Sequence, residues 1–234
     1  MWRAAALVTA MLAGDPAKAA CRQALALGLD VSGSVDSPEY ALQRRGLANA
    51  LRHPEVTEAL LALPQAPVEL MVYEWSAPGA ARVILPWTAI TAAAVLESAA
   101  NRIATAPRTG LPSSTALGAA MRFGITALAP RPCWRRTLDL SGDGKSNTGP
   151  PPAPVRAEAA AAGITINALV IGADAPATGD ARYVEIGELT AYFRFNVIAG
   201  PGAFTEPAFG FSDYEAAMVR KLKRELEGLV VSRR

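Results

Sequence analysis

The feature that most constrains the fold is a nearly continuous apolar run from Arg22 to Leu29, which ends in the turn Asp30-Val31-Ser32-Gly33-Ser34. An uninterrupted run of this length is typical of a strand that is buried on both faces, as in a parallel sheet. Asp30, Ser32 and Ser34 alternate directly after this run, so a turn can bring three oxygen-bearing side chains to one point. Hard oxygen ligands of this kind suit Mg²⁺, Mn²⁺ or Ca²⁺.

Predicted strands and helices alternate along the rest of the chain. We expect strands at 22–29, 68–75, 82–87, 134–140 and 164–171, a short candidate strand at 195–198, an irregular loop at 199–211, and helices at 38–51, 54–61, 92–103, 115–128, 155–162, 182–193 and 213–230. This alternation predicts an α/β fold with a doubly wound, mainly parallel central sheet and helices on both faces. The turn residues Ser76-Ala77-Pro78-Gly79 predict a hairpin, and hence one antiparallel edge strand.

Helix starts are predicted from hydroxyl side chains. We expect Ser37 to cap the first helix, because it precedes Pro38. We expect Ser113 or Ser114 to cap the helix that begins at Thr115.

Residues 1–19 are predicted to be a secretory signal peptide. Met1-Trp2-Arg3 gives a positive start, Ala4 to Ala13 is apolar but too short to span a bilayer, and Ala17-Lys18-Ala19 matches the cleavage pattern. The alternative is an alanine-rich first helix, but Gly14-Asp15-Pro16 would interrupt it. We therefore expect residues 20–234 to form a single domain, periplasmic or secreted, with no membrane span.

The charge balance excludes one large class of partner. Lys and Arg number 23 against 21 Asp and Glu, so the formal net charge is only +2. Aromatic residues are not interleaved with basic ones, as single-stranded nucleic acid binding requires. We therefore expect no nucleic-acid partner, while the oligomeric state is not constrained.

Two acidic turns are expected at one edge of the sheet. Asp143 follows the strand 134–140 within Ser141-Gly142-Asp143-Gly144, just as Asp30 follows the first strand. Ligands of doubly wound sheets bind at the carboxyl ends of the strands. Thr115 opens a helix at the same edge. The predicted metal ligands are therefore Asp30, Ser32, Ser34, Thr115 and Asp143.

These segments together resemble a known metal site. Asp30 to Ser34, then Thr115-Ala116-Leu117-Gly118, then Ser141 to Gly144 resemble the metal-ion-dependent adhesion site (MIDAS) of a von Willebrand factor type A (VWA) domain. Residues 72–76 (VYEWS) and 200–204 (GPGAF) further resemble a bacterial exported group of this fold whose function is undefined. The resemblance covers nearly the whole mature chain, and implies a Rossmann-like VWA fold.

The resemblance also implies roles for the ligands. Ser32 and Ser34 would bind the metal directly, Thr115 directly or through water, and Asp30 and Asp143 largely through water and hydrogen bonds. An open coordination position would then accept a carboxylate from a partner protein, with Mg²⁺ as the expected ion and Mn²⁺ or Ca²⁺ possible. The serines at 113 and 114 depart from the glycines that are more usual in the exported relatives.

A disulfide between Cys21 and Cys133 follows from the implied fold. In this fold the strands that precede Asp30 and Asp143 are parallel neighbours. Cys21 lies nine residues before Asp30 and Cys133 ten before Asp143, so both cysteines are expected near the opposite edge. Export makes the bond chemically possible.

Two alternatives compete with a metal-dependent binding domain. A Mg²⁺-dependent phosphotransferase or hydrolase could use the same acidic strand ends. We expect no enzyme, however, because the only histidine is His53 and the sequence has no Gly-x-Ser-x-Gly elbow or phosphate-binding lysine loop. In the second alternative, the protein is structural and its site is degenerate: Ser32 and Ser34 merely cap a helix and Asp143 a turn.

Several other polar residues are assigned provisional roles. Asp36 is expected near a helix start, and Glu74 on the rim of the site rather than behind it. Asp139 lies within a predicted strand, so we expect it to be buried and paired. Lys145 and Asn147 either touch a partner or belong to a solvated loop.

Overall fold

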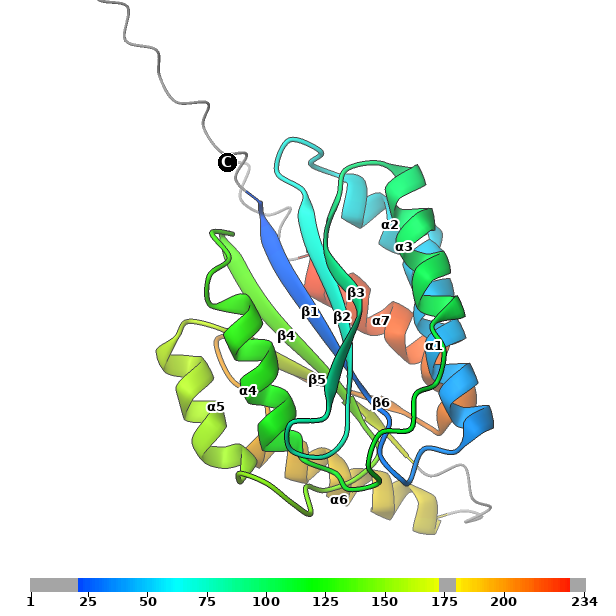
Figure 1. Cartoon of the computed structure of the whole chain (residues 1–234), viewed down its shortest axis with the longest axis vertical. Helices are drawn as coiled ribbons and strands as arrows, with labels where there is room; N and C mark the ends of the chain where they lie inside the picture. Colours follow the sequence, from blue (N-terminus) through cyan, green and yellow to red (C-terminus); the bar gives the residue numbers. More distant parts are fainter. Residues whose placement is uncertain (1–20, 173–179, 228–234) are drawn as a thin grey trace, which may run out of the picture.

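In the computed structural model, which describes residues 21–172 and 180–227, the strands form a single mainly parallel sheet. The order across this part of the chain is β3-β2-β1-β4-β5-β6 (Figure 1). Its strands are β1 (Gln23–Asp30), β2 (Val68–Trp75), β3 (Ala81–Ile90), β4 (Arg135–Gly142), β5 (Thr165–Ile171) and β6 (Thr205–Ala208). Only β3, at one edge, is antiparallel to its neighbour. The predicted fold class is confirmed.

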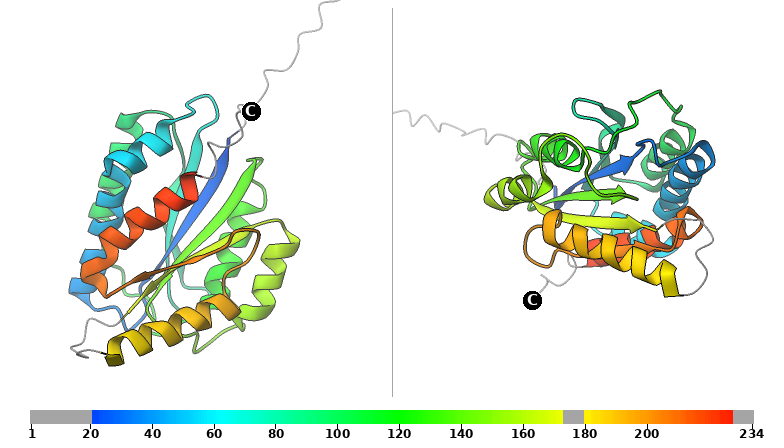
Figure 2. Two further views of the ribbon diagram at one scale, coloured as in Figure 1. Left: turned by 180° about the vertical axis from the view of Figure 1, so that it is seen from behind. Right: turned by 90° about the horizontal axis from the view of Figure 1, so that it is seen from below.

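Helices cover both faces of the sheet (Figures 1 and 2). One face carries α1 (Ser37–Arg52), α2 (Pro54–Leu61), α3 (Ala93–Thr105) and α7 (Tyr214–Glu227), and a 3₁₀ turn (Phe211–Asp213) precedes α7. The other face carries α4 (Leu117–Leu128), α5 (Pro152–Ala161) and α6 (Asp180–Asn196). Each face has its own apolar core, which explains why the strands read as continuous apolar runs.

The central strand β1 shows how one sequence serves two cores. Leu25, Leu27 and Leu29 face the core under α1 and α7, whereas Ala24 and Ala26 face the core under α4. The larger side chains therefore fill one face, and the small ones let α4 approach the sheet closely.

The edge of the sheet formed by the last part of the chain, next to β5, differs from the prediction. The expected strand at 195–198 is wrong, because α6 runs to Asn196, and Ala199 makes only an isolated bridge to Ile166. The predicted loop 199–211 instead contains β6, which pairs in parallel with β5. This strand has four residues and includes Pro207, which argues against a strand in a pattern search but is tolerated at a sheet edge.

Two predicted helix caps are also wrong. Asp36, not Ser37, caps α1: its Oδ1 accepts from the Glu39 N–H at 2.8 Å, and Glu39 Oε2 accepts from the Asp36 N–H at 2.7 Å. This reciprocal pair is a capping box. Helix α4 begins two residues later than predicted and has no side-chain cap, so neither Ser113 nor Ser114 caps it.

The predicted disulfide is present. Cys21 and Cys133 are bonded, with their Cα atoms 4.7 Å apart. They lie just before β1 and β4, which pair in parallel from Gln23 and Arg135 onward, so the bond joins the strands at the edge opposite to Asp30.

The expectations for the chain ends fall partly outside this structure. The predicted signal peptide, residues 1–19, and the last residues of the predicted helix 213–230 lie outside the described ranges. Among the described helices, none combines the length and apolar character that a bilayer span requires.

Candidate metal centre

The ends of β1 and β4 bring the two predicted aspartates together. Asp30 is the last residue of β1, and Asp143 directly follows β4. A Cβ atom built on Gly142 would lie 3.6 Å from Asp30 Oδ2, so β4 passes close to this carboxylate. The Gln43 side chain of α1 donates to the Asp30 carbonyl at 2.8 Å and fixes the end of the strand.

The turn after β1 links these aspartates through serine hydroxyls. The Ser32 N–H donates to Asp30 Oδ1 at 2.8 Å, and the Ser32 and Ser34 hydroxyl oxygens lie 3.2 Å apart. Ser34 Oγ in turn donates to Asp143 Oδ1 at 2.8 Å. Four of the five predicted ligands therefore form one continuous chain of polar contacts, in which Ser34 is exposed to solvent and Asp143 is the last member.

Thr115 reaches the site on the loop between α3 and α4. The Gly33 N–H donates to the Ser113 carbonyl at 2.7 Å, which ties this loop to the turn after β1. A Cβ on Gly33 would stand 2.7 Å from Ser113 Cβ, so only glycine permits this approach. Among the residues with described side chains, no hydrogen bond joins the Thr115 hydroxyl to the other four ligands. The structure thus brings Thr115 to the site through its backbone.

Asn147 holds Thr115 in place. Its Oδ1 accepts from the Thr115 N–H at 2.9 Å, and its own N–H donates to the Thr115 carbonyl at 2.9 Å. Ser146 Oγ adds a longer bond to the same carbonyl, at 3.3 Å. The sequence left Asn147 as a partner contact or a solvated residue. No local pattern shows this role, because the bonds join segments 32 positions apart.

The electrostatics of the site favour a bound cation. Asp30 is fully buried, and its Oδ2 has no hydrogen bond of normal geometry to any residue that the structure describes. Burial, and then the charge of Asp143, raise the pKa of Asp30 to about 8, although hydrogen bonds from Ser32 and a weaker one from the Asp143 backbone oppose this rise. Burial also raises the pKa of Asp143. No positively charged side chain in the described ranges contributes to either pKa, so nothing in this part of the chain neutralises the pair.

The donor set fits a divalent cation. An unpartnered buried carboxylate oxygen, a second carboxylate and three hydroxyl groups are hard oxygen donors, which suit Mg²⁺, Mn²⁺ or Ca²⁺. The reading of Ser32 and Ser34 as helix caps does not hold, because Asp36 caps α1. Cys21, Glu69 and Cys133 also lie within 4.8 Å of one another, but the disulfide leaves no thiolate there.

Glu74 lies behind the site rather than on its rim. Its side chain is 1% exposed. Tyr40 Oη donates to Glu74 Oε1 at 2.6 Å, and an Arg82 NH₂ group donates to Oε2 at 2.6 Å. Arg82 also donates to the Pro107 carbonyl at 2.7 Å, and Tyr40 Oη lies 3.3 Å from the same oxygen. Glu74 therefore anchors the start of the loop that carries Thr115, and the expectation of a rim carboxylate is wrong.

The structure also places the other polar residues that the sequence singled out. Asp139 is buried and lies 2.6 Å from Lys221 Nζ, as expected. Lys145 is exposed in the loop after Asp143. His53 lies between α1 and α2, at the opposite end of α1 from the residues that follow Ser34.

Comparison with known proteins places this geometry in context. The model of a family described as "Protein of unknown function (DUF1194)" matches residues 20–230. No curated protein matches the sequence.

Similar solved structures include a von Willebrand factor type A protein from Catenulispora acidiphila (15% identity, TM-score 0.59, 89% of this chain and 43% of that chain). A second is proximal thread matrix protein 1 from the mussel byssus with a zinc-occupied MIDAS motif (16%, 0.58, 89% and 46%). A third is the pilus adhesin SpaC from Lactobacillus rhamnosus GG (16%, 0.63, 89% and 31%). At these identities the likeness establishes a VWA-like fold alone, and the chain spans less than half the length of each of these three proteins.

Proposed function

The chain belongs to the DUF1194 family, and we propose that it is an exported, metal-ion-dependent protein-binding domain of the adhesion type. One observation carries this proposal: the buried Asp30 carboxylate has an unpartnered oxygen and faces a second carboxylate with no neutralising side chain. Such an arrangement is costly unless a cation joins it. The zinc-occupied MIDAS motif of the mussel protein, which has the same fold, supports this reading.

The five candidate ligands would contribute two kinds of group to the binding of the ion. Ser32, Ser34 and Thr115 offer hydroxyl groups, while Asp30 and Asp143 offer the negative charge. When bound, Mg²⁺ (or Mn²⁺ or Ca²⁺) would supply an electrophilic centre for a carboxylate of a partner protein, because neutral hydroxyls leave much of its charge uncompensated. Exposed Ser34 and half-buried Asp143 leave the site open to a partner on that side.

An exported location is part of the proposal. A Cys21–Cys133 disulfide is the kind of bond that persists in oxidising compartments. The sequence pattern of residues 1–19 and the similarity to a pilus adhesin point the same way. We therefore assign the protein to the periplasm or the secreted fraction.

Binding rather than catalysis is proposed because both carboxylates of the site are assigned to the ion, and no histidine lies beside them among the described residues. Ser32 and Ser34 stand where a Mg²⁺-dependent hydrolase would need a further carboxylate as acid or base. The chain's one histidine, His53, follows a helix of 16 residues, which spans about 24 Å. The alternative function, a phosphotransferase or hydrolase, is tested in the same experiment.

The experiment is affinity capture from the bacterial envelope fraction, run in parallel with Mg²⁺ and with excess chelator. Asp30→Asn keeps the acceptor for the Ser32 N–H but removes the charge, and Glu97→Gln on exposed α3 is the matched control. We expect the wild type and Glu97→Gln to capture the same protein only with Mg²⁺, and Asp30→Asn to lose it. Equal capture in chelator would contradict the metal bridge, and a phosphatase activity that Asp30→Asn abolishes would favour the enzyme.

A further inference from the structure

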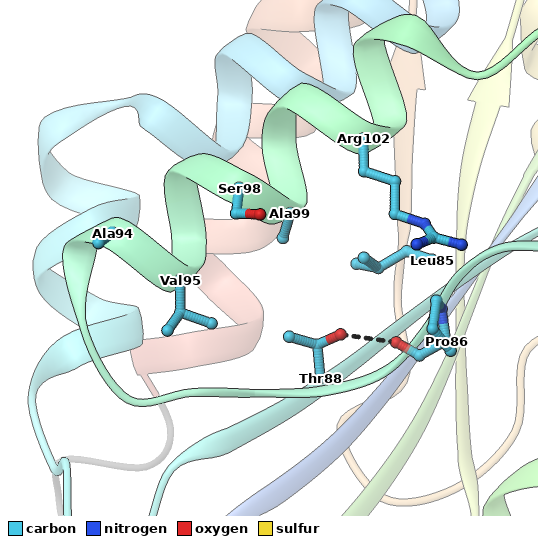
Figure 3. A pocket seen from close by; sticks show the side chains of 8 residues that line it. All are labelled: Leu85, Pro86, Thr88, Ala94, Val95, Ser98, Ala99 and Arg102. Atoms are coloured by element: carbon cyan, nitrogen blue, oxygen red, sulfur yellow. Dashed lines mark hydrogen bonds between the residues drawn. The ribbon is translucent and has the colours of Figure 1, made fainter.

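Several cavities lie among the described residues, and one of them adjoins the candidate metal centre. A cavity of about 370 Å³ lies between β3 and α3 (Figure 3). Its wall includes Leu85, Val95 and Arg102, and the Arg102 Nε–H already donates to the Ile84 carbonyl at 2.7 Å. None of the candidate ligands lines this cavity, and no feature of its wall indicates an occupant.

The second cavity, about 300 Å³, is continuous with the candidate metal centre through Asp143. Its apolar floor comes from Ile171 at the end of β5 and from Ile186 and Leu189 on α6. Ile171 and Ile186 are buried, so this floor belongs to the rigid core rather than to a loop. We call this cavity the α6 groove.

The rim of the α6 groove carries carboxylates that have no partner. Glu185 and Glu188 are three residues apart on α6 and therefore share one side of the helix. Both are exposed, and neither makes an ion pair or a hydrogen bond within the described part of the chain. Lys145 also lines the groove, and its side chain makes no ion pair or hydrogen bond to the residues that the structure describes. With Asp143 committed to the metal centre, the groove has two free negative charges against one positive charge.

We propose that the α6 groove binds a lysine or arginine side chain of the same partner whose carboxylate reaches the metal centre. The aliphatic stem of such a side chain packs on Ile171, Ile186 and Leu189, while its charged head reaches Glu185 and Glu188. A neutral apolar side chain would fill the floor but leave both glutamates without a partner. The inference rests on the proposed binding function and defines its ligand class.

The groove also restricts where the basic residue stands in the partner. Asp143 lines both the groove and the metal centre, so the two subsites are adjacent. An extended chain advances about 3.3 Å per residue, so adjacent subsites are reached by side chains one to three positions apart. The partner segment therefore carries an acidic residue with a lysine or arginine within about three positions of it.

The test is selection of a random peptide library on phage against the purified protein. Clones are bound in Mg²⁺ and released with chelator, in parallel for the wild type, the double variant Glu185→Gln/Glu188→Gln, and a control pair on the other helices, Glu97→Gln/Glu158→Gln. All these glutamates are exposed, so each variant is expected to fold. For the wild type and the control, we expect released clones to share an acidic residue with a nearby Lys or Arg.

In the double variant, the acidic residue should persist while the basic residue falls to its frequency in the library. A synthetic peptide from a wild-type clone should bind about two- to fivefold more weakly for each glutamate removed. Mg²⁺-dependent clones without a basic residue, or with the same basic residue in the double variant, would overturn the α6 groove alone. The absence of any Mg²⁺-dependent clone would overturn the proposed function together with it.

Discussion

Two pairs of carboxylates in the described part of the chain are neutralised differently. Asp139 and Glu225 lie in the core between the sheet and α7, and both contact Lys221: Nζ is 2.6 Å from Asp139 Oδ2 and 2.7 Å from Glu225 Oε1. Asp30 and Asp143 lie at the ends of β1 and β4 and have no such cation in the described ranges.

The pKa values follow this difference. Burial raises the pKa of Asp139 to about 7, the charge of Lys221 opposes the rise, and that of Glu225 adds to it. For Asp30, burial and the charge of Asp143 act together, and its pKa reaches about 8. In the core, Lys221 supplies an ammonium group to the carboxylates. At the carboxyl ends of β1 and β4 there is no such group among the described residues, and the site is open to solvent at Ser34. The contrast supports a structural role for Asp139 and Glu225, and it supports our proposal that Asp30 and Asp143 hold an external ion.

The largest effect is expected from removing the built-in cation. Lys221→Met should lower the free energy of unfolding by about 3–5 kcal/mol, because it leaves two buried carboxylates without their counter-charge. Urea unfolding measures this change, and Mg²⁺ should not reverse it.

Lys223→Met is the control, because Lys223 pairs with exposed Glu55 on the surface. It should leave the urea midpoint nearly unchanged. If Lys221→Met unfolds at the wild-type midpoint, or if Mg²⁺ restores it, the two carboxylate groups are not distinct.

A smaller effect is expected from loosening Thr115. Asn147→Ala removes the acceptor of the Thr115 N–H and should weaken Mg²⁺ binding about 10- to 100-fold, the usual range for a residue behind a metal ligand. Asn147→Asp keeps the acceptor oxygen and should retain most of the affinity. Calorimetric titration checks both variants, and equal Kd values for Asn147→Ala and the wild type would remove Asn147 from the site.

Neutralising Asp30 should have opposite effects on stability and binding. At about pH 9, where the metal-free Asp30 is ionised, Asp30→Asn should raise the free energy of unfolding by about 1–2 kcal/mol, because the unpartnered buried charge disappears. The same substitution in the core, Asp139→Asn, should stabilise the protein less, because it leaves the buried Lys221 ammonium group with one carboxylate fewer to compensate its charge. Thermal unfolding in chelator distinguishes the two variants, and a destabilised Asp30→Asn would contradict the prediction.

The dependence of stability on pH should be the smallest effect. The folded-state pKa values of Asp30 and Asp139, about 8 and about 7, are raised above their unfolded values. Their contribution to stability is therefore fully present below the unfolded pKa of about 3.9, and is lost as the pH rises through the folded values.

The metal-free protein should thus be more stable near about pH 6 than near about pH 9. Saturating Mg²⁺ should reduce this dependence of stability on pH, because bound Mg²⁺ keeps Asp30 ionised and compensates its charge. The contribution of Asp139 should remain, because Asp139 is not part of the metal centre. Melting temperatures in a pH series with and without Mg²⁺ test this. An identical slope in both series would show that the ion does not reach Asp30.

The sequence was most informative where the pattern within one segment is enough to predict its structure. The apolar run before Asp30 and the strand before Asp143 predicted that both aspartates lie at the carboxyl ends of strands. The implied fold predicted that these strands are neighbours and that Cys21 is bonded to Cys133. The residues it missed act across the chain: Asn147 clamps Thr115, Glu74 anchors Pro107 through Tyr40 and Arg82, and Lys221 reaches β4 from the last helix. Their roles depend on packing between distant segments, which no local pattern records. Strand β6 was missed because Pro207 and its short length conceal it.

The most direct test of the central claim is calorimetric titration of Mg²⁺ into the metal-free protein and into Asp30→Asn. The account predicts a saturable site in the wild type and none in the variant, with both proteins folded by circular dichroism. No binding heat in the folded wild type with either Mg²⁺ or Mn²⁺, or the same affinity in both proteins, would show that the carboxylates of Asp30 and Asp143 are not an ion site.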